Sequence, residues 1–239
     1  MDYCDLRIAQ TYDLANPRAA DTDFYLSLAG SQPCRVLDLG CGTGTLCRAL
    51  AERGHRVTGV DPAAAMLDVA RSKPYSESVE WIESSAQRYL SHLRFDLIVM
   101  TGHTFQILLT DADTLAVLDG MRRHLKEGGR VAFDTRNPHL DWASEWAARP
   151  PRTLPGGQVQ ETLKITGVDG EFISFETSYR FPDVTLTTSS TLRFLLREQV
   201  ESLITRSGLV VREIFGDWTS QRFAAADSRE MILVAEIPK

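Results

Sequence analysis

The clearest candidate for a chemical role is a glycine-rich segment at positions 38–44. It reads Asp38-Leu39-Gly40-Cys41-Gly42-Thr43-Gly44 and follows the short apolar run at 36–37. Glycines between a strand and a helix let the backbone approach a ligand closely and adopt conformations that a side chain would forbid. A triphosphate-binding loop needs a Lys followed by Ser or Thr, and this segment holds no Lys. The segment is therefore typical of a loop that binds a nucleotide-like cofactor other than a triphosphate.

The glycine spacing and one acid narrow the choice of cofactor. In a dinucleotide-binding loop the third glycine comes three places after the second, but position 45 is Thr45 and Gly44 comes one residue early. Asp38 lies two residues before Gly40, where a carboxylate would repel a pyrophosphate but attract a ligand that carries an ammonium and a sulfonium. A nicotinamide dinucleotide is therefore the less favoured alternative.

A second acid, Asp61, ends the next apolar run. It lies 21 residues after Gly40, close to the place where an acid accepts hydrogen bonds from both hydroxyls of a ribose. An acid at this place also commonly caps the following helix, so both roles stay open.

These residues need a sheet to position them, and strand and helix patterns alternate between residues 35 and 134. Strands are predicted at 36–39, 57–60, 79–83, 95–100 and 130–134, and helices at 44–53, from Pro62 onward, and from Asp111 to Gly128-Gly129. A last helix near 196–208 precedes strands at 209–215 and 230–237. The pattern predicts an α/β fold with a Rossmann-like, seven-stranded and mostly parallel sheet.

The chain divides into four predicted parts. Residues 1–34 form an N-terminal helical cap, residues 35–157 the cofactor-binding core, and residues 196–239 the last helix and the last two strands of the core. Residues 158–195 alternate between apolar and polar side chains around a turn at Val168-Asp169-Gly170, which predicts an antiparallel β insertion over the active site. The segment before the insertion is rich in Pro and Gly and reads as a loop that holds Trp142 and Trp146.

Composition excludes several classes of protein. The net charge is −6 and no run of Lys and Arg occurs, so a nucleic-acid partner is not expected. The acidic N-terminus does not resemble a signal peptide, and no segment reaches the roughly 20 apolar residues of a membrane span, so we expect a cytoplasmic protein without a membrane partner. The four cysteines include no CxxC pair and no His at zinc-ligand spacing, so we expect reduced thiols and no metal.

Taken together, these motifs resemble the class I S-adenosylmethionine (SAM)-dependent methyltransferases. The resemblance rests on the Asp38–Gly44 loop, the strand end Val60-Asp61, the strand Phe95–Val99 and the segment Leu125–Arg130, and it covers about residues 35–134. The predicted insertion is similar in architecture to the added sheet of small-molecule N- and O-methyltransferases, such as those that act on glycine or on amino sugars. The resemblance implies SAM as the cofactor and a methyl transfer to N or O of a small molecule.

The resemblance also implies roles for individual residues around SAM. The backbone at Gly40, Cys41, Gly42 and Gly44 would face the methionine part of SAM, Asp61 the ribose, Pro62 and Met66 the adenine, Ser85 and Ala86 the adenine edge, and the Thr101 carbonyl the ammonium. Many family members have an acid where Ser85 stands, so main-chain bonds at Ala86 would carry more of that contact. Tyr12 would lie on a segment that closes over SAM, where its ring could stabilise the sulfonium; the alternative is a Tyr that anchors the N-terminal helix.

The segment after the strand at 95–100 supplies the candidates for the transfer itself. His103 is the candidate general base, because histidine is the residue type that ordinarily gains and loses a proton near neutrality; the alternative is a His that binds backbone or packs against the adenine. Phe105, Gln106, Arg136 and Trp142 are candidates for contacts with the acceptor. A homodimer is compatible with the sequence, and so is a SAM-binding protein without catalysis.

Overall fold

Two sheets organise residues 5–238, which are the residues that the computed structural model describes; Cys4 lies outside them. The larger sheet has the strand order β10-β11-β5-β4-β1-β2-β3. Its strands are β1 (Arg35–Leu39), β2 (Arg56–Asp61), β3 (Val79–Glu83), β4 (Phe95–Met100), β5 (Leu125–Arg136), β10 (Val210–Phe215) and β11 (Glu230–Glu236). Only β11 runs against its neighbours, since it pairs antiparallel with both β5 and β10. The predicted seven-stranded, mostly parallel sheet is confirmed.

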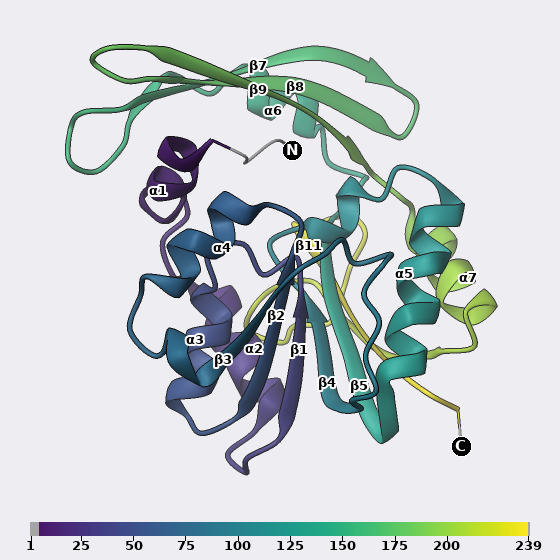
Figure 1. Cartoon of the computed structure of the whole chain (residues 1–239). Helices are drawn as coiled ribbons and strands as arrows, with labels where there is room; N and C mark the ends of the chain where they lie inside the picture. Colours follow the sequence, from purple (N-terminus) through teal and green to yellow (C-terminus); the bar gives the residue numbers. More distant parts are fainter. Residues whose placement is uncertain (1–4, 239) are drawn as a thin grey trace.

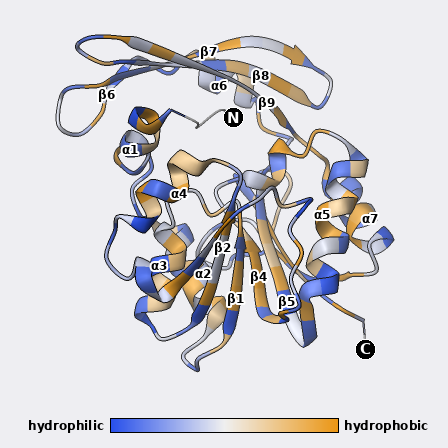
Figure 2. Ribbon diagram, in the orientation of Figure 1, coloured by the Kyte–Doolittle hydropathy of each residue, from blue (hydrophilic) through white to orange (hydrophobic). Residues whose placement is uncertain are grey.

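Helices cover both faces of the larger sheet (Figure 1). They are α2 (Ala20–Ala29), α3 (Thr45–Glu52), α4 (Ala64–Arg71), α5 (Asp111–His124) and α7 (Arg197–Arg206). Helix α1 (Leu6–Ala15) lies beyond the end of the sheet, next to α4, and the short 3-10 turns are η1 (Ser76–Ser78) and η2 (Thr104–Ile107). Alternate strand residues face opposite ways: Val36 packs with Leu50 on the side of α2 and α3, while Leu37 packs with Leu118 on the side of α5 and α7. The strands are therefore buried on both faces, as their hydropathy colouring in Figure 2 also indicates.

One predicted boundary is wrong. The helix expected to continue to Gly128-Gly129 ends at His124, and β5 already begins at Leu125. Leu125 has extended backbone angles and pairs with Phe95 of β4, and Lys126 binds the Asp96 carboxylate at 2.8 Å. Pairing with β4 therefore ends the helix before the glycines do.

The smaller sheet is antiparallel and lies beyond one end of the larger one (Figure 1). It comprises β6 (Arg152–Thr153), β7 (Gln160–Asp169), β8 (Phe172–Arg180) and β9 (Thr185–Arg193). The register of β7 on β8 places the turn at Gly170-Glu171, next to the expected Asp169-Gly170 signal. The added antiparallel sheet is thus confirmed, and it begins at Arg152.

The segment read as a loop before this sheet contains a helix, α6 (Trp142–Ala147). The Asp141 side chain caps it by accepting a hydrogen bond from the Ser144 amide at 3.0 Å. Trp142 and Trp146, one turn apart, pack against Phe175 of β8 and other apolar side chains of the smaller sheet. Tertiary burial of the two tryptophans therefore forms a helix that the surrounding prolines concealed.

Two further properties concern residues 5–238 as a whole. None of the helices in this range combines the length and the apolar character that a membrane crossing requires. Within the same range, no group of three or more His, Cys, Asp and Glu side chains is arranged to hold a metal ion.

Candidate cofactor and acceptor site

The carboxyl ends of β1, β2, β4 and β5 bring most of the candidate residues to one edge of the larger sheet. In open α/β sheets ligands bind at this edge. β1 pairs with both β2 and β4, so the glycine loop after β1 lies between Asp61 and the Thr101–Gln106 segment. The turn η2 also contacts β9 of the smaller sheet through the hydrogen bond from Gln106 Nε2 to the Arg193 carbonyl, at 3.2 Å. The smaller sheet therefore lies over the edge at which the candidates meet.

Asp61 joins the glycine loop to the following helix. Its Oδ2 accepts a hydrogen bond from the Gly42 amide and its Oδ1 one from the Ala63 amide, both at 2.9 Å. Burial raises the pKa of the Asp61 carboxyl, and the two backbone hydrogen bonds oppose that rise. Each carboxylate oxygen keeps a second acceptor position, so ribose hydroxyls could still be bound. The Asp61 side chain can therefore fix the start of α4 and bind a ribose at the same time.

The glycines are required for different reasons. A Cβ at Gly40 would lie 2.5 Å from Thr104 Cγ2, and one at Gly44 would lie 2.3 Å from the Trp81 ring. Gly42, with φ 54°, has only Met66 Cε nearby at 3.4 Å. All three glycines have positive φ; close packing also excludes a side chain at Gly40 and Gly44, whereas a Cβ at Gly42 would make only an ordinary contact with Met66.

Two backbone amides of the glycine loop are hydrogen-bonded to the neighbouring strand β2. The amides of Gly40 and Cys41 both donate to the Val60 carbonyl, at 2.7 and 3.1 Å. The N–H groups of Gly40 and Cys41 are therefore used by hydrogen bonds to β2, which fix the start of the loop.

Asp38 provides an acceptor that no described residue satisfies. Its side chain is 1% exposed, its Oδ2 lies 3.3 Å from the Cys47 thiol, and its Oδ1 has no hydrogen-bond partner among residues 5–238. Burial raises the pKa of Asp38 to about 7. A buried polar atom without a partner is costly, so an unsatisfied carboxylate beneath the glycine loop fits a ligand that brings positive charge or hydrogen-bond donors.

Tyr12 lies close to the glycine loop and to Asp61. Its ring packs with Ala65 and Met66 at the start of α4. Burial raises the pKa of Tyr12 to about 12, and the neighbouring carboxylates of Asp61 and Asp13 add to the effect. The phenol therefore stays neutral, and its ring is near the residues expected to hold the cofactor.

Asp13, which sequence reasoning used only as the neighbour of Tyr12, ties α1 to the loop. Its carboxylate accepts hydrogen bonds from the Thr43 hydroxyl and from the Lys73 ammonium. Lys73 also donates to the Thr43 carbonyl at 3.1 Å. The Tyr12-Asp13 pair was the available signal for this contact, but nothing local pointed to Lys73 after α4.

His103 begins η2 with a left-handed backbone, φ 61°. Its amide donates to Asp134 Oδ2 at 2.7 Å, and the fully buried Asp134 accepts a second hydrogen bond from the Tyr25 hydroxyl at 2.6 Å. The imidazole is 19% exposed, and its Nε2 lies 2.7 Å from Glu230 Oε2. Sequence reasoning missed Asp134 and Glu230, which hold the candidate base from β5 and β11.

The remaining cofactor candidates lie at the same edge. The Thr101 carbonyl already accepts from the Thr104 amide and hydroxyl, at 3.3 and 2.7 Å. Ser85 and Ala86 are half-buried, and the preceding Ser84 amide donates to the Asp61 carbonyl at 3.1 Å. Pro62 is exposed, whereas Met66 is buried.

The four candidates for contacts with the acceptor lie where the larger sheet meets the smaller one, a region that we call the joint: Phe105, Gln106, Arg136 and Trp142. Phe105 stacks on Phe133 with ring centroids 4.2 Å apart and belongs to the core. Gln106 is 1% exposed, and its Oε1 accepts from Arg136 Nη1 at 2.9 Å. The structure therefore places Phe105 and Gln106 in packing that is closed to solvent.

Arg136 and Trp142 complete this joint. The Arg136 guanidinium lies 5.6 Å from the Trp142 ring and 5.0 Å from the Trp146 ring. Burial lowers the pKa of Arg136 to about 10, and the nearby Glu230 opposes the effect. Trp142 is buried and donates to the Asn137 carbonyl at 2.7 Å. Trp142 therefore holds the segment after β5 in place.

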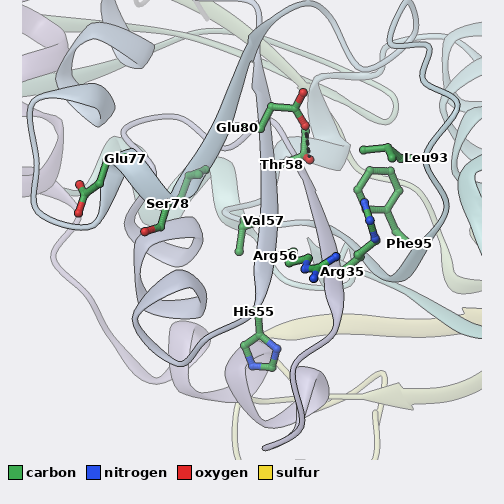
Figure 3. A pocket seen from close by; sticks show the side chains of 11 residues that line it. Arg35, His55, Arg56, Val57, Thr58, Glu77, Ser78, Glu80, Leu93 and Phe95 are labelled. Atoms are coloured by element: carbon green, nitrogen blue, oxygen red, sulfur yellow. Dashed lines mark hydrogen bonds between the residues drawn. The ribbon is translucent and has the colours of Figure 1, made fainter.

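A hollow of about 400 Å³ lies at the opposite end of the strands (Figure 3). Its lining includes Arg35, Arg56 and Val79, which begin β1, β2 and β3, and Thr58, whose hydroxyl donates to Glu80 at 3.0 Å. Because cofactors in open α/β sheets bind at the carboxyl ends, this hollow does not correspond to the candidate site.

Known proteins resemble the chain in both sequence and fold. A family model described as a methyltransferase domain matches residues 36–129. The cypemycin N-terminal methyltransferase of a Streptomyces species is 30% identical over 203 residues, which cover 84% of this chain and 82% of that protein.

Solved structures extend the likeness to the whole fold. A SAM-dependent methyltransferase from Clostridium acetobutylicum ATCC 824 has a TM-score of 0.80 at 17% identity and covers 98% of each chain. The sugar N-methyltransferase KedS8 from Streptoalloteichus sp ATCC 53650 also has a TM-score of 0.80, at 15% identity, over 100% of this chain and 95% of its own. With its glycine loop, Asp61 and seven-stranded sheet, the chain belongs to the class I SAM-dependent methyltransferases.

Proposed function

We propose that the protein transfers the methyl group of SAM to an amine nitrogen of a small molecule or of a peptide terminus. The observation that carries the proposal is the meeting of the glycine loop, Asp61, Tyr12 and His103 at one sheet edge beneath the smaller sheet. The choice of nitrogen is supported by the relative that acts at the N-terminus of cypemycin and by the sugar N-methyltransferase of the same fold.

The residues at the site fit SAM. Gly42 and the unsatisfied Asp38 carboxylate would face the cationic methionine part, Asp61 would accept from the ribose, and the Tyr12 ring would lie near the sulfonium. SAM supplies an activated methyl group on a positively charged sulfur. The protein must align the acceptor and exclude water, and alignment alone can lower a barrier by about 7–11 kcal/mol.

The acceptor must also lose a proton. In the proposed step the amine nitrogen forms a bond to the methyl carbon while the carbon–sulfur bond breaks and its electron pair stays on sulfur. A proton then has to leave the nitrogen, or has to leave an ammonium before the attack. His103 is held at the strand end with part of its imidazole open to solvent and would take that proton, an aid of about 10²–10⁴-fold.

Other functions are less well supported. Because the chain belongs to the methyltransferases, a nicotinamide-dependent oxidoreductase is excluded, although the glycine loop alone had allowed it. An RNA acceptor conflicts with the net charge of −6, because phosphate contacts require a basic surface. A SAM-binding protein without turnover is disfavoured by the relative over 84% of the chain, which is a methyltransferase.

The test is a turnover assay with the full chain, SAM and a panel of amines, alcohols and short peptides, read as S-adenosylhomocysteine formed and as methylated product by mass spectrometry. Methylation of an amine supports the proposal. Methylation confined to hydroxyl-only acceptors moves the acceptor atom to oxygen, and SAM binding by calorimetry without any product favours the binding-protein alternative.

A further inference from the structure

The side-chain contact between His103 and Glu230 is not needed to pair β11 with β5 and β10. Glu230 is the first residue of β11 and lies 127 positions from His103 along the chain, yet Nε2 and Oε2 are 2.7 Å apart. The two side chains are 19% and 15% exposed, so the contact is sheltered but not sealed. A fold that needed only strand pairing at this point would not need a carboxylate aimed at an imidazole.

Two carboxylates lie near the Nε2 atom of the His103 imidazole. Asp134 of β5, 3.8 Å away, and Glu230 of β11 both lie on the Nε2 side, and Arg136 is opposite Glu230 in the β5–β11 register. Nδ1 has no hydrogen-bond partner among residues 5–238. An ionised carboxylate can only accept, so Nε2 carries the hydrogen, and in the neutral imidazole Nδ1 then offers its lone pair.

A second observation concerns the far side of Glu230. This residue lines a hollow of about 480 Å³ formed with the β10–β11 connection, including Gly216, Trp218 and Arg229. Asn137 holds that connection by donating to the Ala225 and Ser228 carbonyls, at 2.9 and 2.7 Å. Glu230 therefore contacts the imidazole through its carboxylate and also belongs to the lining of this hollow.

We propose that Glu230 is the positioning residue of the reaction: it holds His103 in the Nε2–H tautomer and passes the acceptor's proton to water in the hollow. This rests on the proposed function. The acceptor's N–H bond breaks as Nδ1–H forms, the resulting imidazolium gives its Nε2 proton to Glu230, and the carboxylate releases that proton to water. Exchange with solvent then returns the imidazole to its starting tautomer.

The first test does not need an acceptor. Nitrogen-15 NMR of the full chain with labelled histidine reports the tautomer of each ring, and the His103 signals are assigned by their loss in His103→Asn. We expect the Nε2–H form in the wild type and a mixture of tautomers in Glu230→Ala. Glu236→Ala, at the other end of β11 where Glu236 pairs with Arg212, is the matched control and should leave His103 unchanged.

The second test uses an acceptor from the turnover assay. Glu230→Gln, which keeps the size of the side chain and removes its charge, should lower kcat by about 10–10²-fold and leave SAM affinity unchanged. A wild-type His103 in the Nδ1–H form, or the same tautomer in Glu230→Ala as in the wild type, would overturn the inference. If calorimetry shows that the wild type does not bind SAM, the proposed function is overturned instead. Failure of the inference and failure of the proposed function therefore give different results.

Discussion

The Asp61 carboxylate accepts a hydrogen bond from the Gly42 amide at 2.9 Å, and this bond connects the end of β2 to the middle of the glycine loop. The same carboxylate receives the Ala63 amide at 2.9 Å, so a single side chain fixes both the loop and the entry to α4. The residue proposed to hold the ribose therefore also orders the loop and the start of α4.

Substitution of Asp61 should weaken SAM binding. Asp61→Ala removes the acceptor proposed for the ribose and the partner of the Gly42 amide, and we expect a loss of about 1.5–3 kcal/mol by calorimetry. Asp68→Ala, an exposed acid of α4 that pairs with Arg71, is the control and should bind normally. Equal affinity of Asp61→Ala and the wild type would remove Asp61 from the cofactor site.

Substitution of His103 should separate rate from binding. His103→Ala should lower turnover by about 10²–10⁴-fold and leave SAM affinity nearly unchanged, because the imidazole is held by Glu230 and takes the acceptor's proton. The exposed His92 supplies the control substitution. A parallel loss of SAM binding would make His103 a cofactor contact, and normal turnover would leave alignment as the main catalytic device.

Substitution of Asp13 should release α1. Its carboxylate is the shared acceptor of Thr43 and Lys73, so Asp13→Ala leaves the Lys73 ammonium with the Thr43 carbonyl alone. We expect faster hydrogen exchange in α1 and weaker SAM binding, since Tyr12 on the same helix loses its support. Asp23→Ala, an exposed partner of Arg18 on α2, should change neither. Unchanged exchange in α1 would contradict the role given to this contact.

The sequence predicted those parts of the site that depend on local pattern. The short apolar strands, the glycine loop and Asp61 follow from spacing within about thirty residues, and all lie at one sheet edge. Glu230 could not be predicted, because its contact with His103 depends on the register of β11 on β5. Helix α6 was read as a loop, since the burial of Trp142 and Trp146 against another sheet outweighs the signals of Pro150 and Pro151.

Asp38 should make both stability and SAM binding depend on pH. The unfolded chain releases this proton near 3.8, and burial moves the pKa of Asp38 in the fold to about 7. Between these two pKa values the folded state holds the Asp38 proton and the unfolded state does not. The contribution of Asp38 to stability is therefore fully present below pH 3.8 and is lost as the pH rises to about 7.

A cationic ligand favours the carboxylate, so SAM binding at about pH 6 should release a proton from Asp38. Calorimetry in two buffers of different ionisation enthalpy measures that release. Asp38→Asn should abolish it, and stability to denaturant in this variant should fall less as the pH rises from about 5 to 8. Equal proton release in the wild type and in Asp38→Asn would assign the linkage to another group.

Arg136 should stabilise the joint between the two sheets. Its guanidinium faces the Trp142 and Trp146 rings and donates to the buried Gln106, and no carboxylate of residues 5–238 lies within 4.0 Å of it. Replacing a buried charge by an apolar side chain can be neutral, because the cost of desolvating the charge disappears. Here the replacement also leaves Gln106 Oε1 without its donor at a side chain that is 1% exposed.

Arg136→Met should therefore lower the free energy of unfolding by about 1–3 kcal/mol, measured by urea denaturation followed by tryptophan fluorescence. Arg136→Lys should recover only part of the loss, since an ammonium keeps the charge over the rings but lacks the planar fork that reaches Gln106. Arg229→Met is the matched control: its guanidinium also lies over Trp142, at 4.6 Å, but its side chain is 56% exposed and should cost less. If Arg136→Met unfolds at the same urea concentration as the wild type, the guanidinium is free of a structural role and is available to an acceptor.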